Sequence, residues 1–309
     1  MSGLLEIREN IRNFYSKYEV YLIPLFKLLL ALTTFLFINA SLGYNSKINN
    51  PMIVLVVALM CSFLPLNIMV LLGAIFIILH LYALTMECAI VASVLFLLMF
   101  LMYFRFSPKD TLIVVLLPIA FVLKIPYAVV LAAGLIGTPV SIISVGCGVI
   151  VYYFVSFVRS NAALITTLDS DSAVAKLRYV IDGMLGNEEM LVTIAAFAVT
   201  VIIVYLIRRL SVDYAWTISI IVGTVTCVVA LLLGDLAFDI NVSIVTAIIG
   251  AVVSFAIAKV LEFFAFNVDY TRTEYVQFED DEYYYYVKAI PKNSVTKAKK
   301  TVKKITSVI

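Results

Sequence analysis

Long, uninterrupted runs of apolar residues constrain this chain more than any other feature of its sequence. A helix that crosses the hydrocarbon core of a bilayer needs about 20 apolar residues. Six runs meet or approach that length: Val20–Ala40, Ala89–Phe106, Pro139–Val158, Met190–Ile207, Tyr214–Leu233 and Ile244–Phe266. Because 63% of all residues are hydrophobic, against about half in a soluble domain, lipid must be the solvent for most of the chain. The sequence therefore predicts an all-α polytopic membrane protein with six full transmembrane helices.

Two further apolar runs are interrupted by proline. Met52–Ala83 is broken at Pro65, and Thr111–Ile136 is broken just before Pro126. Proline removes a backbone donor and clashes with the preceding helical turn, so each run should bend or break there. We expect each run to form two short helices folded into a hairpin, which brings the number of hydrophobic helices to about ten. The alternative is a single kinked span for each run.

Lysine and arginine predict the orientation of the spans, because cytoplasmic loops are enriched in both. The hairpin arrangement places Arg105 and Lys109 on the same side as Arg208 and Arg209, whereas kinked spans would separate them. That side also holds the basic residues after Asn267, which are Arg272, Lys288, Lys292, Lys297, Lys299, Lys300, Lys303 and Lys304. The exceptions to the bias are Lys47, Arg159, Lys176 and Arg178. We therefore predict hairpins in both broken runs, in a multi-pass protein of the plasma membrane with cytoplasmic N- and C-termini.

The two broken runs begin two similar units. Residues 52–106 and residues 111–158 each contain a hairpin followed by a full span, and in the predicted topology they enter from opposite sides. Many secondary transporters are built from such inverted pairs, with interrupted helices near the bilayer midplane. We therefore interpret residues 20–158 as a membrane domain that contains an inverted repeat. Chance similarity between two runs rich in Leu, Val and Ile is the alternative.

Three further segments flank or follow this domain. Residues 1–19 place apolar side chains at helical spacing between basic ones, which predicts a cytoplasmic amphipathic helix. Residues 159–189 contain an extracytoplasmic amphipathic helix, Asp171–Leu185. Residues 190–266 form a bundle of three spans. Small residues allow its last helix to pack closely within the chain or against a second copy, and these are Ala247, Gly250, Ala251, Ser254 and Ala258.

Residues 267–309 are predicted to form a cytoplasmic tail with two parts. The stretch YVQFEDDEYYYYVKAI is rich in tyrosine, which favours a short β-strand or hairpin with the acidic residues at its turn. Beyond Pro291, apolar residues recur at helical spacing between lysines. This pattern is typical of a basic amphipathic helix held against anionic lipids of the inner leaflet. A solvated, disordered segment is the alternative.

Four polar residues are candidates for a substrate or ion pathway. Lys124 is the strongest, because an ionisable group within a membrane segment needs a partner or water. The alternative for Lys124 is a shallow hairpin from which its side chain reaches the interface. Asn67 holds the corresponding place in the first hairpin, Thr138 lies where the chain breaks before a full span, and Glu87 lies near the end of its segment. Structural roles at turns and interfaces are the alternatives for these three.

Nothing in the sequence supports catalysis, a cofactor, a metal site or nucleic-acid binding. Metal sites need clusters of His, Cys, Asp and Glu, and His80 is the only histidine. We interpret His80 as a hydrogen-bonded packing residue and the four cysteines as apolar packing residues. Lys259 and Glu262, three residues apart, are predicted to form a structural ion pair. Lys27, inside the first span, is predicted to extend towards the interface.

Two kinds of function are compatible with these features. We expect a transporter or permease of unknown substrate, with its pathway between the two hairpin units. The alternative is a non-transporting scaffold or assembly subunit that recruits partners through its tail, because few polar groups lie at membrane depth. The lipid bilayer is the predicted partner in both cases, and a second copy or another membrane protein is a further candidate.

Overall fold

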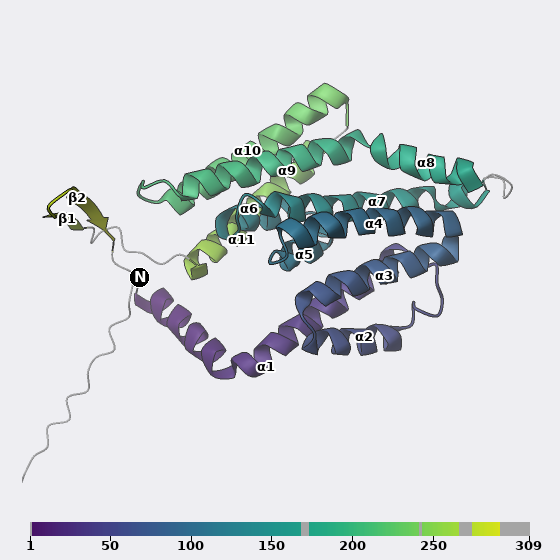
Figure 1. Ribbon diagram of the computed structural model, residues 1–309, viewed down its shortest axis with the longest axis horizontal. Helices are drawn as coiled ribbons and strands as arrows, with labels where there is room; N and C mark the ends of the chain where they lie inside the picture. Colours follow the sequence, from purple (N-terminus) through teal and green to yellow (C-terminus); the bar gives the residue numbers. More distant parts are fainter. Residues whose placement is uncertain (1, 168–172, 241–242, 266–273, 291–309) are drawn as a thin grey trace, which may run out of the picture. The chain divides into compact units, whose positions relative to one another are not determined.

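The structure, a computed structural model, describes residues 2–167, 173–240, 243–265 and 274–290 (Figure 1). Residues 20–263 form one compact unit, and the described residues at the two chain ends belong to a second. The helices are α1 (Ser2–Ser41), α2 (Pro51–Phe63), α3 (Leu66–Leu84), α4 (Met86–Phe106), α5 (Thr111–Val122), α6 (Pro126–Ile136), α7 (Ser141–Thr167), α8 (Ala173–Leu185), α9 (Glu188–Arg208), α10 (Ala215–Phe238) and α11 (Ile244–Ala265). The strands are β1 (Glu274–Glu279) and β2 (Tyr284–Ala289).

The predicted fold class is confirmed. Within the described residues, all helices except the amphipathic α8 are strongly apolar or contain an apolar span, and the two strands form a small hairpin. In the part of the chain that the structure describes, seven helices are long and apolar enough to cross a membrane: α1, α3, α4, α7, α9, α10 and α11. Six of these coincide with the predicted full spans, and α3 is an additional one. The chain is therefore a multi-span membrane protein.

The first broken run folds back at Pro65 but does not form two short helices. α2 has 13 residues and α3 has 19, so only α2 is too short to span. The Ser62 hydroxyl donates to the Pro24 carbonyl at 2.8 Å, whereas the Asn39 amide donates to the Ile48 carbonyl just before α2 begins. α2 therefore runs antiparallel to α1. The expectation of two short arms is wrong because the proline lies nearer the start of the run, which leaves enough residues after it for a complete span.

His80 closes the opposite end of this hairpin. Its fully buried ring accepts a hydrogen bond at Nδ1 from the Asn45 N–H at 3.2 Å, so Nε2 carries the proton and donates to Asn39 Oδ1 at 2.8 Å. These bonds join the last turns of α3 to the end of α1. Histidine thus has the hydrogen-bonded packing role that we predict for it. The single kinked span is wrong for this run, because α2 and α3 lie in opposite directions.

The second broken run forms a hairpin of two short helices, as predicted. α5 has 12 residues and α6 has 11, so neither reaches the length of a span. The hydroxyl of Ser107, just before α5, bonds that of Ser144 on α7 at 2.7 Å. The backbone N–H of Thr138, just after α6, donates to Ser141 on α7 at 3.1 Å. Both open ends therefore lie beside the start of α7, and Lys124 at the tip of the hairpin is exposed.

The two hairpins open in opposite directions. We name the ends of the helix unit after α9, which begins at the Glu189 side and ends at the Arg208 side. Asn67, at the tip of the first hairpin, accepts a hydrogen bond from Tyr103 at 3.0 Å near the end of α4, at the Arg208 side. The second hairpin instead opens towards that side, where Arg208 donates to the Gly137 carbonyl at 2.7 Å. The inverted repeat stays a prediction, and the unequal arms place the two tips at different depths.

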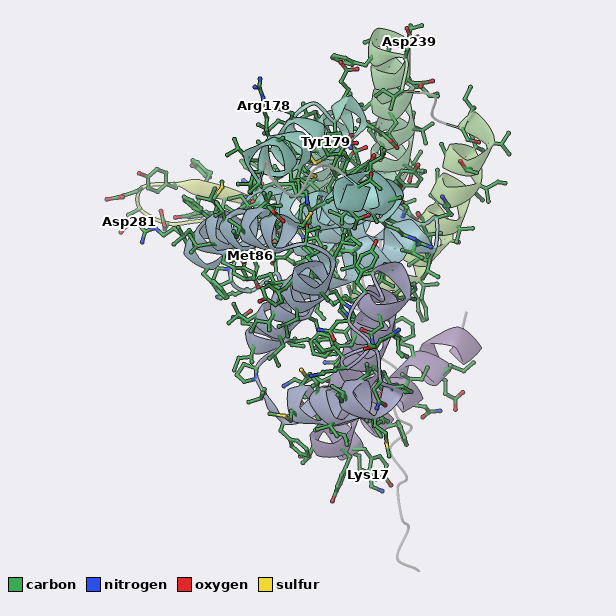
Figure 2. All side chains as sticks on the ribbon, turned by 90° about the vertical axis from the view of Figure 1, so that its right-hand side faces the viewer. Lys17, Met86, Arg178, Tyr179, Asp239 and Asp281 are labelled. Carbon is green, nitrogen blue, oxygen red and sulfur yellow. The ribbon has the colours of Figure 1, made fainter. Side chains whose placement is uncertain are left out.

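α7 and α8 cover the Glu189 side. α7 continues beyond the predicted end at Val158 to Thr167, and α8 buries Lys176, Val180 and Met184, which share one helical face. Figure 2 looks onto this side of the molecule: Arg178 projects away from the helices, and Tyr179 lies beside it on α8. The Tyr179 hydroxyl donates to Asn161 of α7 at 2.9 Å. An amphipathic helix is present here, as the sequence predicts.

α11 packs its small residues inside the chain. The buried ones are Ala247, Gly250, Ala251, Ser254 and Ala258, all predicted as a packing face. Near the other end of α11, Lys259 bonds Glu262 at 2.5 Å and donates to Thr217 of α10 at 3.0 Å. The predicted ion pair is confirmed, and it joins the last two spans.

The described residues at the chain ends have simple structures. α1 is interrupted at Tyr18, whose φ of −114° and ψ of 18° are not helical, so the N-terminal stretch and the first span are two helical pieces. β1 and β2 are antiparallel, with Glu274 opposite Ala289 and Glu279 opposite Tyr284. The predicted basic helix beyond Pro291 lies outside the described residues.

Asp280 organises the turn of the β-hairpin. Its carboxylate accepts hydrogen bonds from the N–H groups of Glu282 at 2.9 Å and Tyr283 at 2.7 Å, and from the Tyr285 hydroxyl at 2.8 Å. These bonds favour the charged form and lower the pKa of Asp280. The carboxylate therefore supports the turn above its unfolded pKa, and this support is lost as the pH falls through the lowered folded pKa. The predicted hairpin with an acidic turn is confirmed.

Replacing Asp280 with alanine should open the hairpin without disturbing the membrane helices. The turn then loses three acceptor contacts, and a two-stranded hairpin alone is marginally stable. We expect faster amide hydrogen exchange across residues 274–289 of Asp280→Ala, measured by mass spectrometry on the full chain. Asp281→Ala is the matched control, and equal acceleration in both variants would contradict the assigned role of Asp280.

Candidate functional site

A cavity of about 360 Å³ lies between the two hairpin units. Its walls come from α1, from α3 and α4 of the first unit, and from α5 and α7 of the second. Most of the lining is aliphatic or aromatic, as at Ile77, Phe96 and Val151. Lys124 and Arg159 also line it, and among the described residues no Asp or Glu does. A pocket of this size, with apolar walls and few charged groups, is typical of ligand sites.

The cavity extends along the helices rather than across them. On α7 it is lined from Cys147 to Arg159, a rise of about 18 Å at 1.5 Å per residue. At its Arg208 end lies Tyr103, whose hydroxyl bonds Thr111 at 2.7 Å and Asn67 at 3.0 Å. At its other end lies Arg159. The cavity therefore runs from a polar cluster at the Arg208 side to a basic residue towards the Glu189 side.

Lys124 occupies a backbone position that normally belongs to glycine. Its φ of +62° is left-handed, and the Ile125 N–H bonds the Ala120 carbonyl at 2.8 Å, the six-to-one bond of a Schellman motif that ends α5. A side chain in this conformation costs about 1–2 kcal/mol relative to glycine. The turn alone would therefore be more stable with glycine at this position than with lysine.

Neighbouring helices contact the hairpin tip. The Tyr127 ring packs edge-on against Phe197, near the middle of α9, with centroids 6.1 Å apart. A methyl group on Gly250 would lie only 2.6 Å from the Lys124 carbonyl oxygen, so α11 touches the tip directly. The backbone of the hairpin tip therefore packs against α9 and α11, whereas the side chains of Val122, Leu123 and Lys124 are exposed, and the shallow hairpin stays the alternative for Lys124.

Arg159 lies on α7 beyond the hairpin tip, towards the Glu189 side. Its side chain is exposed in the protein and lies close enough to Tyr44, in the loop after α1, to influence it. Burial raises the pKa of Tyr44, and the positive charge of Arg159 opposes that rise. Arg159 was an exception to the predicted charge bias, and in the structure this residue lines the cavity.

A second, smaller cavity of about 140 Å³ adjoins Lys124. It is lined by Tyr153, Glu189 and Thr193, among others. The Tyr153 hydroxyl donates to Glu189 at 3.1 Å and lies 3.1 Å from the Thr193 hydroxyl. Lys124 lines both cavities, so the tip of the hairpin separates an apolar, basic space from a polar one that contains a carboxylate.

The four predicted site residues do not converge on one point. Lys124 lines the cavity, and Asn67 is one hydrogen bond away from it through Tyr103. Thr138 is exposed at the Arg208 side, where its backbone N–H donates to the Ser141 hydroxyl and its carbonyl accepts from the Ser141 N–H. Glu87 is half-buried in the first turn of α4, at the opposite end of the unit. Neither Thr138 nor Glu87 lines the two cavities around Lys124.

Two basic residues have roles that the sequence does not reveal. Arg208 donates to the carbonyl groups of Leu135 and Gly137, which end α6, and so caps the second hairpin. Lys27 donates to the Leu64 carbonyl at 3.1 Å, at the tip of the first hairpin, rather than extending freely to the interface. The sequence shows the basic residues in their spans and the proline breaks in the hairpins. It does not show that each basic side chain lies beside a hairpin, because that contact depends on the fold.

Comparisons with protein-family models, with curated proteins and with solved structures found no match to this chain. The fold and the cavity therefore define its class by themselves. It is a multi-span α-helical membrane protein in which two oppositely directed hairpins flank an apolar, basic cavity.

Replacing Lys124 with glycine should preserve or raise stability. Glycine removes the left-handed strain, worth about 1 kcal/mol, while Lys124→Ala keeps the strain and also lacks the charge. We expect the detergent-solubilised Gly variant to unfold at or above the wild-type temperature, and the Ala variant to unfold below the Gly variant. If both variants fell equally below the wild type, the ammonium group itself would support the fold.

Replacing Gly250 with alanine should displace the hairpin tip. The new methyl group would meet the Lys124 carbonyl oxygen at 2.6 Å and the Tyr127 ring at 3.0 Å, and overpacking of this kind costs about 1–3 kcal/mol. Gly146→Ala, on α7, is the control because no atom lies within 4 Å of its added methyl group. Thermal unfolding of the purified variants should show a loss for Gly250→Ala only. Equal stability in the two would mean that α11 does not press on the tip.

Proposed function

We propose that this protein is a membrane transporter or permease whose pathway runs between the two hairpin units. The observation that carries the proposal is the cavity between those units, with the tip of an interrupted apolar run and its lysine on the cavity wall. Interrupted helices tolerate irregular backbone at depth where protein or a water-filled space surrounds the break. Oppositely directed hairpins are also the arrangement on which many transporters are built.

Two ends of the cavity suggest how such a pathway would be closed and entered. Tyr103, Asn67 and Thr111 form a hydrogen-bonded cluster at the Arg208 end. Arg159 at the other end is exposed and basic, which suits the entry of an anion. We propose that the Arg208 side faces the cytoplasm of the cell, because Arg105, Lys109 and the basic tail would then follow the usual charge bias. The polar cluster would be the cytoplasmic gate.

A scaffold that acts through its tail is the second candidate function. It is favoured by the β-hairpin, in which Tyr275 and Tyr286 are 79% and 78% exposed and both strand edges are unpaired within the described residues. Exposed strand edges and aromatic side chains are suited to binding another protein. This function requires no open space around Lys124, and that difference separates the two candidates.

Cysteine labelling in intact cells tests the transport proposal. Single cysteines at positions 67, 124 and 159 would be introduced into a chain lacking Cys61, Cys88, Cys147 and Cys227. We expect positions 159 and 124 to react with a small charged maleimide from one side and position 67 only from the other. Leu97→Cys is the lipid-facing control, since Leu97 is 59% exposed but lies outside the cavity, and it should react only with an apolar reagent. If position 124 behaved like position 97, no aqueous pathway would reach the hairpin tip.

A second arm compares the tail with the hairpin tip. Deletion of residues 267–309 should leave the labelling pattern of positions 67, 124 and 159 unchanged, since every described residue that lines the cavity precedes the tail. A scaffold would instead lose its function with the tail and remain indifferent to Lys124→Gly. The labelling and the deletion together therefore decide between the two functions.

A further inference from the structure

We propose that the cavity binds an anionic amphiphile, with a phosphate headgroup between Lys124 and Arg159 and a hydrocarbon tail along the apolar walls. The inference rests on the proposed function, for which it names the substrate class. It commits to a lipid-like molecule rather than a free inorganic anion, because the charged part of the cavity is small and the apolar part is long.

Lys124 and Arg159 lie about one helical turn apart along the helix axes. α5 and α7 run side by side in the same direction, since Leu117 adjoins Gly148 and Phe121 stacks on Tyr152 with centroids 4.4 Å apart. Lys124 is three residues beyond Phe121, and Arg159 is seven residues beyond Tyr152. The two levels therefore differ by four residues, or about 6 Å of helical rise. Long basic side chains can reach a common anion across such a separation.

The two cations have no protein partner in this space. Neither forms an ion pair within the part of the chain that the structure describes, and the cavity contains no described acidic side chain. Glu189 lies in the neighbouring cavity, where it already accepts a hydrogen bond from Tyr153. Both side chains are exposed in the protein and so are free to meet a ligand, and arginine and lysine are the residues that most often bind phosphate. The headgroup of the ligand should therefore be acidic.

The rest of the cavity is suited to a hydrocarbon chain. From Arg159 the walls continue towards the Arg208 side along Phe96, Val114 and Met69, to the Tyr103 hydroxyl. This path is about 18 Å long on α7. A free phosphate would leave these walls unfilled, and a neutral lipid would leave both cations unpaired. An amphiphile places a hydrocarbon chain against the apolar walls and an anionic headgroup beside Lys124 and Arg159.

Native mass spectrometry of the full-length protein in dodecyl maltoside tests the proposal, with dioleoyl phosphatidic acid as the probe. We expect one molecule to be retained per chain, and Lys124→Gly and Arg159→Gln each to weaken binding about tenfold, the effect of losing one charge-assisted hydrogen bond. Lys47→Gln is the matched control, because Lys47 is a basic residue at the same end of the unit that does not line the cavity. Dioleoylglycerol, which has the tails without the phosphate, should not be retained.

Four results would overturn the proposal: equal retention of dioleoylglycerol, displacement of the lipid by inorganic phosphate at the same concentration, equal weakening by Lys47→Gln, or a second protein chain in place of the lipid. These results are separate from a failure of the transport proposal. If the protein retained the lipid but a cysteine at position 124 did not react with the charged maleimide, the cavity would be a lipid site without a transport pathway. If the cysteines reacted as expected but the protein did not retain the lipid, the pathway would serve another substrate.

Discussion

A helix that ends within a bilayer leaves backbone carbonyl groups that water cannot reach, and capping of these groups supports both hairpins of this protein. The tip of the first hairpin is capped by Lys27, which reaches the Leu64 carbonyl from the neighbouring α1. The second hairpin is closed at its tip by the Schellman bond from Ile125 to Ala120 and at its open end by Arg208. Each cap replaces hydrogen bonds that the regular helix would have supplied.

The space between the hairpins lies beside a direct contact of their helices. α3 and α5 pack against each other in the cluster that contains Met69 and Val115, and both residues also line the cavity. On the other side of the hairpin, the Tyr127 ring at the start of α6 packs against Phe197 of α9, and Gly250 of α11 lies against the hairpin tip. The hairpin that lines one side of the cavity is therefore also in contact with α9 and α11, which do not line the cavity themselves.

The length of the apolar runs and the placement of proline were sufficient to predict most of the fold. They located the spans, the fold-back of both broken runs and the lysine at the tip of the second hairpin. They did not predict that α3 is a full span, because a broken run reveals where it breaks but not how far each arm continues. The tyrosine-rich strands were predictable because their turn carries its own signal at Asp280.

The candidate site was harder to predict, because it depends on contacts between distant segments. Lys124 was found from its place in an apolar run, but Arg159 appeared only as a basic residue on the unexpected side. That the two residues lie about one helical turn apart follows from the stacking of Phe121 on Tyr152, which no local pattern encodes. Glu87 and Thr138 illustrate the opposite case, since polar residues near span ends are usually explained by the interface itself.

Energetics also limit what the cavity between the hairpins can be. Its volume of about 360 Å³ is lined mostly by apolar side chains, which gain dispersion contacts when another apolar group fills the space. Water has few polar partners along those walls, and it finds them mainly at the two ends, near Tyr103 and near Lys124 and Arg159. A hydrocarbon chain suits the apolar length, and an anionic group suits the end that carries the two exposed cations. An occupant that combines these two chemical properties therefore fits the cavity better than either property alone.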